Sequence, residues 1–430
     1  MKKLVSLVLV LALALSACSF ALADERVQVE FWYGLGGATG EIIQNTIEEF
    51  NNMQDKYTII GVTKGSYTET FEEIQAPIAA KNPPALTVLE YSQVSMLADK
   101  NVLEDLTPYI ENSDYNKDDI VPAFYNQGVF GDKVFALPLQ GTTQVFYYNK
   151  TLFEKAGIEN PDELLDTWEG TLEASKKLVE AGYMGWEPMW GRYNLIDIAY
   201  ANGGKLLSED GRKVLINSPE WVEAWDFIGK AIHEDEVMAI HSGGQGWEYW
   251  YSTIDDVMLN RAGGYTGSAG DQGDLDFSYI VAHTQPAKGL NGKGGAAVVE
   301  ATQMVVLKDA SPEAKQGAFE FLKYLTNTEH TANWSLKTGY IAVRLSAQED
   351  PTFAAFAAEN PQVLVPLNQA ATIGAPYILD PTGNEIYDAL DYACDLVEIE
   401  GIPAQEALDE AAEQAQKALD KYWKKIDEAK

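Results

Sequence analysis

The chain has 430 residues, with 31 Lys and Arg against 65 Asp and Glu, so its net charge is −34 at pH 7. This charge repels nucleic-acid phosphates and anionic lipids, which excludes a sequence-independent nucleic-acid binder and a protein held electrostatically on a membrane. Two Cys and four scattered His exclude a zinc ribbon, an HExxH site and a disulfide scaffold, and we expect neither a metal nor a cofactor.

The N-terminus has the features of an export signal. Met1-Lys2-Lys3 precedes an apolar run at 4–15 that is short for a membrane span, so residues 1–17 are interpreted as a signal peptide. Leu15-Ser16-Ala17-Cys18 resembles the lipobox of bacterial lipoproteins, in which the Cys is lipidated after cleavage. The alternative is ordinary cleavage after Ala23. Both predict an extracytoplasmic protein, either anchored to the cell membrane by lipid on Cys18 or free in the periplasm or medium.

The first third of the chain alternates between β-rich and helical patterns. The spacing of apolar residues predicts strands over 27–33, 57–62 and 85–89, and helices over about 41–52, 70–81 and 92–98. A glycine-rich turn at 34–40 follows the first strand, but its spacing is not that of a dinucleotide-binding loop. This alternation indicates an α/β fold around a mostly parallel sheet.

The same pattern continues to the C-terminus. We expect strands over 135–138, 144–148, 279–282 and 302–307, and helices over 151–156, 171–181, 312–326, 386–399 and from about 404 to the end. Two segments rich in Trp, Tyr and Gly lie at 183–193 and 243–251. No linker rich in Pro or Ser divides the chain, which favours two lobes joined by several crossings.

One passage is specific to a family. The passage contains three blocks in order: Gly131-Asp132-Lys133-Val134-Phe135-Ala136-Leu137-Pro138, then Tyr147-Tyr148-Asn149-Lys150, then Leu152-Phe153-Glu154-Lys155-Ala156-Gly157. Together they resemble a signature of the family 1 extracellular solute-binding proteins of ABC importers. Three shorter motifs resemble the glycerol-3-phosphate-binding members of that family most closely. They are Phe31-Trp32, Lys64-Gly65-Ser66-Tyr67 and Lys337-Thr338-Gly339-Tyr340.

The resemblance implies a bilobal α/β fold with a ligand cleft between the lobes. By analogy, the first lobe comprises 26–137 and 285–330, and the second comprises 138–284 and 331–430. The implied function is to capture a sugar, an oligosaccharide or a glycerol-phosphate-type solute and to deliver it to ABC permease subunits by hinge closure, without catalysis. The alternatives are a secreted glycan-active hydrolase and an interaction lipoprotein without a transport role.

The resemblance also assigns candidate ligand contacts. Tyr67, Glu90, Thr142, Ser268 and Tyr340 match positions at which the glycerol-3-phosphate binders contact their ligand. Glu90 ends an apolar strand, where open α/β sheets bind ligands, although a Glu there could instead cap the following helix.

Two departures from the pattern bear on the ligand. Glu300 lies in the stretch where the relatives have a contacting Gly, and no Arg follows Arg344, although the relatives hold phosphate with an Arg in the C-terminal third. Arg192 could substitute, or could form a surface salt bridge. Because a phosphate in a closed cleft usually needs such a cation, a neutral sugar or short oligosaccharide is favoured over glycerol 3-phosphate.

Aromatic residues support a sugar ligand. Trp32 and Tyr33 end the first strand and are expected to face the cleft. Trp190 and Tyr193, together with Trp186, lie in the first aromatic segment and are expected to face it as well. The second segment, with Trp247, Tyr249, Trp250 and Tyr251, carries a weaker indication. Such rings stack on sugar faces, although the usual place of a Trp is the core.

Overall fold

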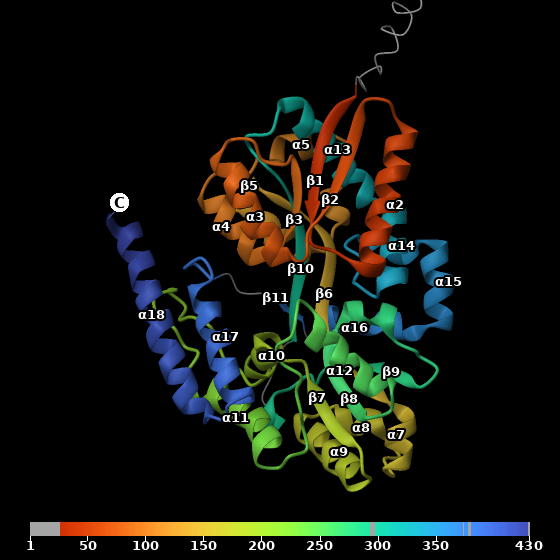
Figure 1. Ribbon diagram of the computed structural model, residues 1–430, viewed down its shortest axis with the longest axis vertical. Helices are drawn as coiled ribbons and strands as arrows, with labels where there is room; N and C mark the ends of the chain where they lie inside the picture. The colour runs from red at the N-terminus through yellow and green to blue at the C-terminus, as the bar shows by residue number, and fades with distance from the viewer. Residues whose placement is uncertain (1–25, 293–296, 373, 377–379, 429–430) are drawn as a thin grey trace, which may run out of the picture.

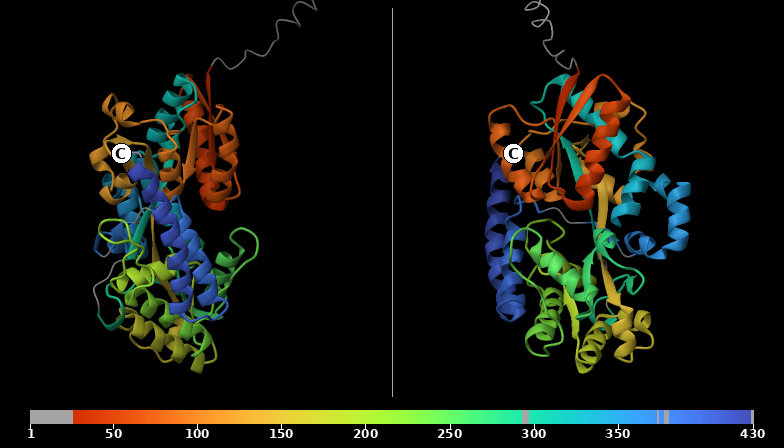
Figure 2. Two further views of the ribbon diagram at one scale, coloured as in Figure 1. Left: turned by 90° about the vertical axis from the view of Figure 1, so that its left-hand side faces the viewer. Right: turned by 45° about the vertical axis from the view of Figure 1, so that its right-hand side comes forward.

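The chain is organised as two lobes stacked along its long axis (Figure 1). The computed structural model describes residues 26–292, 297–372, 374–376 and 380–428, so the predicted signal peptide and Cys18 lie outside the described residues. Figure 2 shows the division into lobes from two further sides. Within the described ranges, no helix combines the length and the apolar character needed to cross a membrane. Helices cover sheets in both lobes, which confirms the expected α/β class.

The upper lobe is built on a twisted sheet. Its strand order is β2 (Tyr57–Thr63), β1 (Val27–Tyr33), β3 (Leu86–Leu89), β10 (Ala297–Val306) and β6 (Ala136–Asn149). β1 is parallel to β2 and β3, so these strands end at one edge. The helices of this lobe are α2 (Gly37–Met53), α3 (Tyr67–Ala79), α4 (Tyr91–Asp99), α5 (Thr107–Glu111), α6 (Pro122–Tyr125) and α13 (Pro312–Leu325), and a small hairpin joins β4 (Val129–Phe130) to β5 (Lys133–Val134).

Two long strands connect the lobes. β6 and β10 pair antiparallel from Ala136 opposite Val305 to Thr143 opposite Val299, and the second half of β6 then pairs with β8 (Ala262–Ser268) and β9 (Ile280–His283) of the lower lobe. The sequence predicted two strands here, because Gln140 to Thr143 contains no strongly apolar residue. The structure shows one continuous strand through both lobes. β11 (Gly374–Pro376) pairs with the other side of β10.

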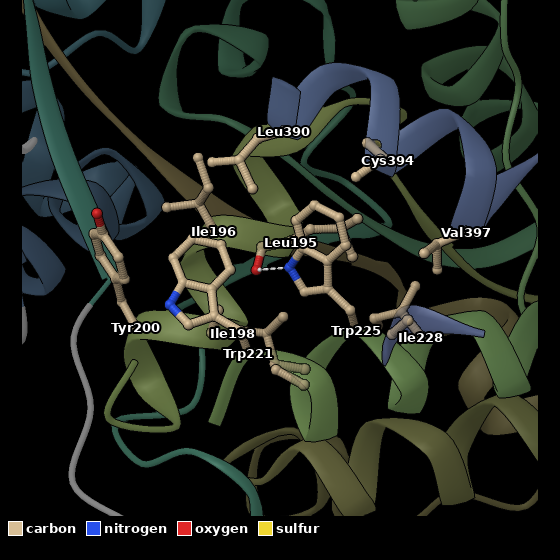
Figure 3. Packing of buried hydrophobic residues seen from close by; sticks show 14 of the residues in the cluster. Leu195, Ile196, Ile198, Tyr200, Trp221, Trp225, Ile228, Leu390, Cys394 and Val397 are labelled. Atoms are coloured by element: carbon tan, nitrogen blue, oxygen red, sulfur yellow. Dashed lines mark hydrogen bonds between the residues drawn. The ribbon is translucent and has the colours of Figure 1, made fainter. Parts of the chain in front are cut away.

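The lower lobe packs helices around the order β7 (Met184–Pro188), β8 and β6. Its core contains Trp221 and Trp225 beside Leu195, and the Trp225 indole donates to the Leu195 carbonyl oxygen over 3.0 Å (Figure 3). Cys394 is buried there, as its apolar surroundings in the sequence predict. The helices are α7 (Lys150–Lys155), α8 (Pro161–Leu165), α9 (Trp168–Glu180), α10 (Arg192–Ala201), α11 (Pro219–His233), α12 (Glu248–Met258), α17 (Glu385–Glu398) and α18 (Ala404–Glu428).

The remaining helices lie beside the crossing strands. They are α14 (Thr328–Thr338), α15 (Pro351–Glu359) and α16 (Val365–Thr372). Trp334 of α14 packs into the upper core with Val29 and Phe31, although the predicted limits place 331–430 wholly in the second lobe. The reason is that α14 continues from α13 and packs against α2. Leu290 and Val298 depart in the other direction: they pack into the lower core, although the predicted limits place 285–330 in the first lobe. The other lobe limits stay a prediction.

Candidate ligand-binding site

A cavity of about 850 Å³ lies where the two lobes face each other. Four strands end at it: β1 before Gly34, β3 before Glu90, β7 before Met189, and β8 at Ser268. The carboxyl ends of strands in open α/β sheets are the usual place for a ligand, because the connecting loops there leave a crevice. The crossing strands β6 and β10 form its back wall through residues such as Gln140 and Thr302. The cavity is therefore built by both lobes together.

Two carboxyl groups of this cavity interact electrostatically. Glu90 and Glu300 are both half-buried and both line it. Burial raises the pKa of Glu90, with Arg192 opposing that rise. Burial and the negative charge of Glu90 raise the pKa of Glu300 to about 8. The pair therefore holds a proton near neutral pH, so it can both donate and accept hydrogen bonds with hydroxyl groups.

Glu90 combines the two roles considered for it. Its backbone N–H donates to the Gln93 side-chain oxygen over 3.1 Å, and the Gln93 amide donates back to Glu90 Oε2 over 3.3 Å, so the residue caps α4. The same carboxyl group lines the cavity. The cap fixes its position, and a fixed carboxyl group loses little freedom when it binds a ligand.

Arg192 begins α10, directly after Gly191, whose φ of 113° a residue with a side chain rarely adopts. Its guanidinium forms an ion pair with Asp391 of α17, and its side chain is 12% exposed. The Tyr193 and Tyr387 rings lie 5.0 and 5.2 Å from it. The salt bridge considered as the alternative is present, with a partly exposed acid as the partner, and both side chains line the cavity. A role of Arg192 in ligand binding stays a prediction.

Hydroxyl groups form a second polar region. Thr142 Oγ1 and Ser268 Oγ are 3.0 Å apart, which brings β6 and β8 together at the cavity. The Gln140 amide donates to the Tyr67 hydroxyl over 3.3 Å. Burial raises the pKa of Tyr340 to about 12, so its hydroxyl group, which also lines the cavity, stays a donor at neutral pH.

Aromatic rings of the lower lobe cover one side of the cavity. The Trp190 indole donates to Asp395 Oδ1 over 2.9 Å, and its ring meets Tyr249 edge to face with centroids 4.9 Å apart. Trp250 donates to Asp271 Oδ1 over 2.8 Å. Tyr193 and Trp247 line the same cavity. The second aromatic segment, at 243–251, thus supplies much of the cavity wall, although the sequence indicated its role less strongly than that of the first.

Three aromatic residues lie elsewhere than expected. Tyr33 is 2% exposed and packs against Phe31 in the upper core. Trp32, on the opposite face of β1, packs toward α3 with the Lys64 ammonium 3.8 Å above its ring. Trp186 is buried and donates to Thr266 Oγ1. Side chains alternate across a strand, so each of these points into a layer of helices or strands and not beyond the strand end.

A comparison with known protein families shows which family the chain belongs to. The model of a family described as "Bacterial extracellular solute-binding protein" matches residues 45–362. The chain belongs to this family.

Relatives within the solute-binding proteins include two curated examples. The sn-glycerol-3-phosphate-binding periplasmic protein UgpB of Rhizobium meliloti (strain 1021) is 25% identical over 368 residues, which cover 81% of this chain and 82% of that protein. The UgpB of Brucella abortus (strain 2308) is 26% identical over 379 residues, covering 83% and 84%.

Solved structures of solute-binding proteins share the bilobal fold. UgpB from Mycobacterium tuberculosis in complex with glycerophosphocholine superposes with a TM-score of 0.81 at 19% identity, covering 92% of this chain and 98% of that one. The GacH receptor of Streptomyces glaucescens gives 0.79 at 18%, covering 92% and 99%. Lmo0181 from Listeria monocytogenes, in complex with cycloalternan, gives 0.78 at 22%, covering 92% and 99%. The bilobal architecture expected from the sequence is confirmed.

Several lining residues were missed by sequence analysis of this solute-binding protein. Asp391 and Asp395 lie one turn apart on α17, and Asp271 follows β8. The i, i+4 spacing on α17 was readable, but nothing in the sequence indicated which face of that helix meets the cavity. Gln140 lies within the family signature and could have been found there.

Proposed function

We propose that this solute-binding protein captures a neutral sugar or short oligosaccharide in the interlobe cavity. The observation that carries the proposal is the lining itself: most of the aromatic rings lie on the lower side, and carboxyl and hydroxyl groups lie on both sides and on the back wall. Rings cover the apolar faces of a sugar, and carboxyl groups accept from its hydroxyl groups. The proposed contacts are Tyr67, Glu90, Thr142, Trp190, Arg192, Tyr193, Ser268, Glu300 and Tyr340.

The charge of the lining supports a neutral ligand over a phosphate monoester. Six acidic side chains line the cavity, namely Glu90, Asp271, Asp274, Glu300, Asp391 and Asp395, against two basic ones, Arg192 and Lys337. Burial raises the pKa values of Glu300 and Asp271 to about 8, so these two side chains are largely neutral at pH 7. The other four acids still outnumber the two bases, and a dianionic phosphate would lose its hydration beside this remaining negative charge. Arg192 is already paired with Asp391, so a phosphate group would have to share the guanidinium charge with that carboxylate.

A glycerophosphodiester with a cationic headgroup is the second candidate. The two curated relatives are named for glycerol 3-phosphate, and one structural neighbour holds glycerophosphocholine. Aromatic rings beside carboxylates are the groups that bind a quaternary ammonium. The Trp190 and Tyr249 rings close to Asp395 make up such a set.

In this proposal the protein releases its ligand unchanged to the permease subunits of an ABC importer. The two crossing strands would act as the hinge, and closure of the lobes would present a ligand-dependent surface. Lipid on Cys18 would hold the protein at the membrane.

The test is a thermal-shift screen of the chain from Ser19 onward. The panel contains mono-, di- and oligosaccharides, glycerol 3-phosphate and glycerophosphocholine. A ligand at about a hundredfold its Kd adds about 2.7 kcal/mol of stability. Stabilisation by neutral sugars alone supports the first candidate. Stabilisation by glycerophosphocholine alone supports the second. A response to glycerol 3-phosphate alone contradicts the charge argument, and conversion of a bound sugar during incubation contradicts a binding role without catalysis.

A further inference from the structure

A second cluster of polar side chains lies in the lower lobe, outside the cavity. It consists of Glu187 on β7, Asp256 on α12 and His241 on the segment that leads from α11 to α12. One nitrogen and one oxygen from each carboxyl group lie within 4.8 Å of one another. The cluster joins three chain segments that are separate in the sequence.

The burial of the Glu187 carboxyl group is not explained by contacts with other side chains. Its side chain is 0% exposed, and neither carboxyl oxygen has a hydrogen-bond partner among the described residues. Its Oε1 lies 4.0 Å from His241 Nε2. A buried carboxyl group without partners costs free energy unless a proton or a cation neutralises it. Burial, the charge of Asp256 and a proton shared with the Asp256 side chain raise the pKa of Glu187 to about 9, so a cation that binds near neutral pH must displace that proton.

Asp256 and His241 are already oriented toward the same point. Asp256 Oδ2 lies 2.9 Å from His241 Nε2, while Asp256 Oδ1 pairs with Arg261. Arg261 thereby fixes the carboxylate and leaves Oδ2 directed to the cluster. His241 is 37% exposed, which leaves a path from solvent to the buried oxygens of Glu187.

We propose that Glu187, His241 and Asp256 form a binding site for a divalent transition metal such as Zn²⁺. One imidazole and two carboxylates suit Zn²⁺ and related ions, whereas Mg²⁺ and Ca²⁺ prefer oxygen ligands alone. Three protein ligands leave a fourth position for water. Bonds of about 2.0–2.2 Å require the three groups to draw slightly closer when the ion binds.

The site uses segments that also carry the aromatic wall of the cavity: Asp256 lies on α12 together with Tyr249 and Trp250. Glu187 precedes Trp190 by three residues, and His241 and Asp256 lie on either side of Tyr249 and Trp250 in the sequence. A bound ion would link β7 to α12 and the segment before it. It would therefore stabilise the part of the lower lobe that carries these rings.

The test uses the chain from Ser19 onward after removal of metals with a chelator, and the probe is Zn²⁺ alone. We expect one equivalent to bind by calorimetry and Tm to rise by roughly 2–5 °C. Mg²⁺ at the same concentration controls for screening of the negative net charge, which is −36 once Lys2 and Lys3 are removed (29 basic against 65 acidic residues), and should leave Tm nearly unchanged.

Two variants assign the effect to the cluster. His241→Gln keeps a polar group beside Asp256 but removes the imidazole, and we expect at least a tenfold loss of Zn²⁺ affinity. His233→Gln, at an exposed histidine of the same lobe, is the matched control and should bind Zn²⁺ like the unmodified chain. Glu187→Gln replaces one carboxylate ligand with a neutral amide of the same shape, and should also lose Zn²⁺ binding.

Either of two results would overturn the proposal. The first is an unmodified chain that shows no stoichiometric Zn²⁺ binding, in which case the proton alone neutralises Glu187. The second is binding that persists unchanged in His241→Gln and Glu187→Gln, which would place the ion elsewhere.

Discussion

The lower side of the cavity and its upper side and back wall use different kinds of side chain. The lower side presents the rings of Trp190, Tyr249 and Trp250. Each of the two indole N–H groups donates a hydrogen bond to an aspartate. Above and behind, Glu90 and Glu300 present carboxyl groups at a strand end and on a crossing strand. Apolar contact depends on area, whereas hydrogen bonding depends on geometry and protonation. We therefore expect the aromatic side to dominate affinity and the carboxyl groups to set its selectivity and pH dependence.

The largest effect is expected from Trp190→Ala. Loss of a buried aromatic contact should weaken binding of the ligand found in the screen by roughly a hundredfold, or about 2.8 kcal/mol, measured by calorimetry. Trp190→Phe is the matched control: it keeps a ring and loses the hydrogen bond to Asp395, so its loss should be clearly smaller. Equal losses in both variants would mean that the indole N–H matters more than stacking.

Glu90→Gln should weaken binding by about tenfold. A charge-assisted hydrogen bond to a ligand hydroxyl contributes more than a neutral one, while the Gln side chain can still accept from Gln93 and cap α4. Glu48→Gln, at an exposed position of α2, is the control for the change in net charge. An unchanged affinity in Glu90→Gln would restrict this residue to helix capping.

Glu300→Gln should alter the pH dependence of stability. The pKa of Glu300 is about 8 in the folded protein against a usual value of 4.5, so the folded state binds more protons between these values. Stability tied to this group is therefore present below about pH 4.5 and is lost as the pH rises toward 8. Urea unfolding should show the variant gaining stability relative to the unmodified chain across that window, and a constant difference would contradict the raised pKa.

The smallest effect is expected from Trp32→Phe. Because Trp32 packs toward α3 and does not line the cavity, ligand affinity should change by less than about twofold, although the smaller ring costs about 1 kcal/mol of stability. Calorimetry and urea unfolding on the same preparation separate the two effects. A tenfold loss of ligand affinity would contradict this expectation and would indicate that Trp32 contacts the ligand.

Local patterns predicted many of the elements but not all: the fully buried strand over 85–89 was predicted, whereas α11 was missed although it has one buried face. The strand over 27–33 and the helix from 404 both match the structure, since their apolar residues follow periods of two and 3.6. α10 was missed because residues 194–201 are all buried, which leaves no polar face to mark a helix. β6 was divided in two because its middle carries Gly and Thr where it passes from one lobe to the other.

The sequence by itself determined the α/β class, the family through the passage at 131–157, and the position of Glu90 at a strand end, because these depend on residues close together in the chain. Only the tertiary structure decided which aromatic rings face the cavity. It alone paired Arg192 with Asp391, 199 positions away, and brought Glu187, His241 and Asp256 together despite the expectation of no metal. Contacts between distant segments depend on how whole lobes pack, and no local spacing records that.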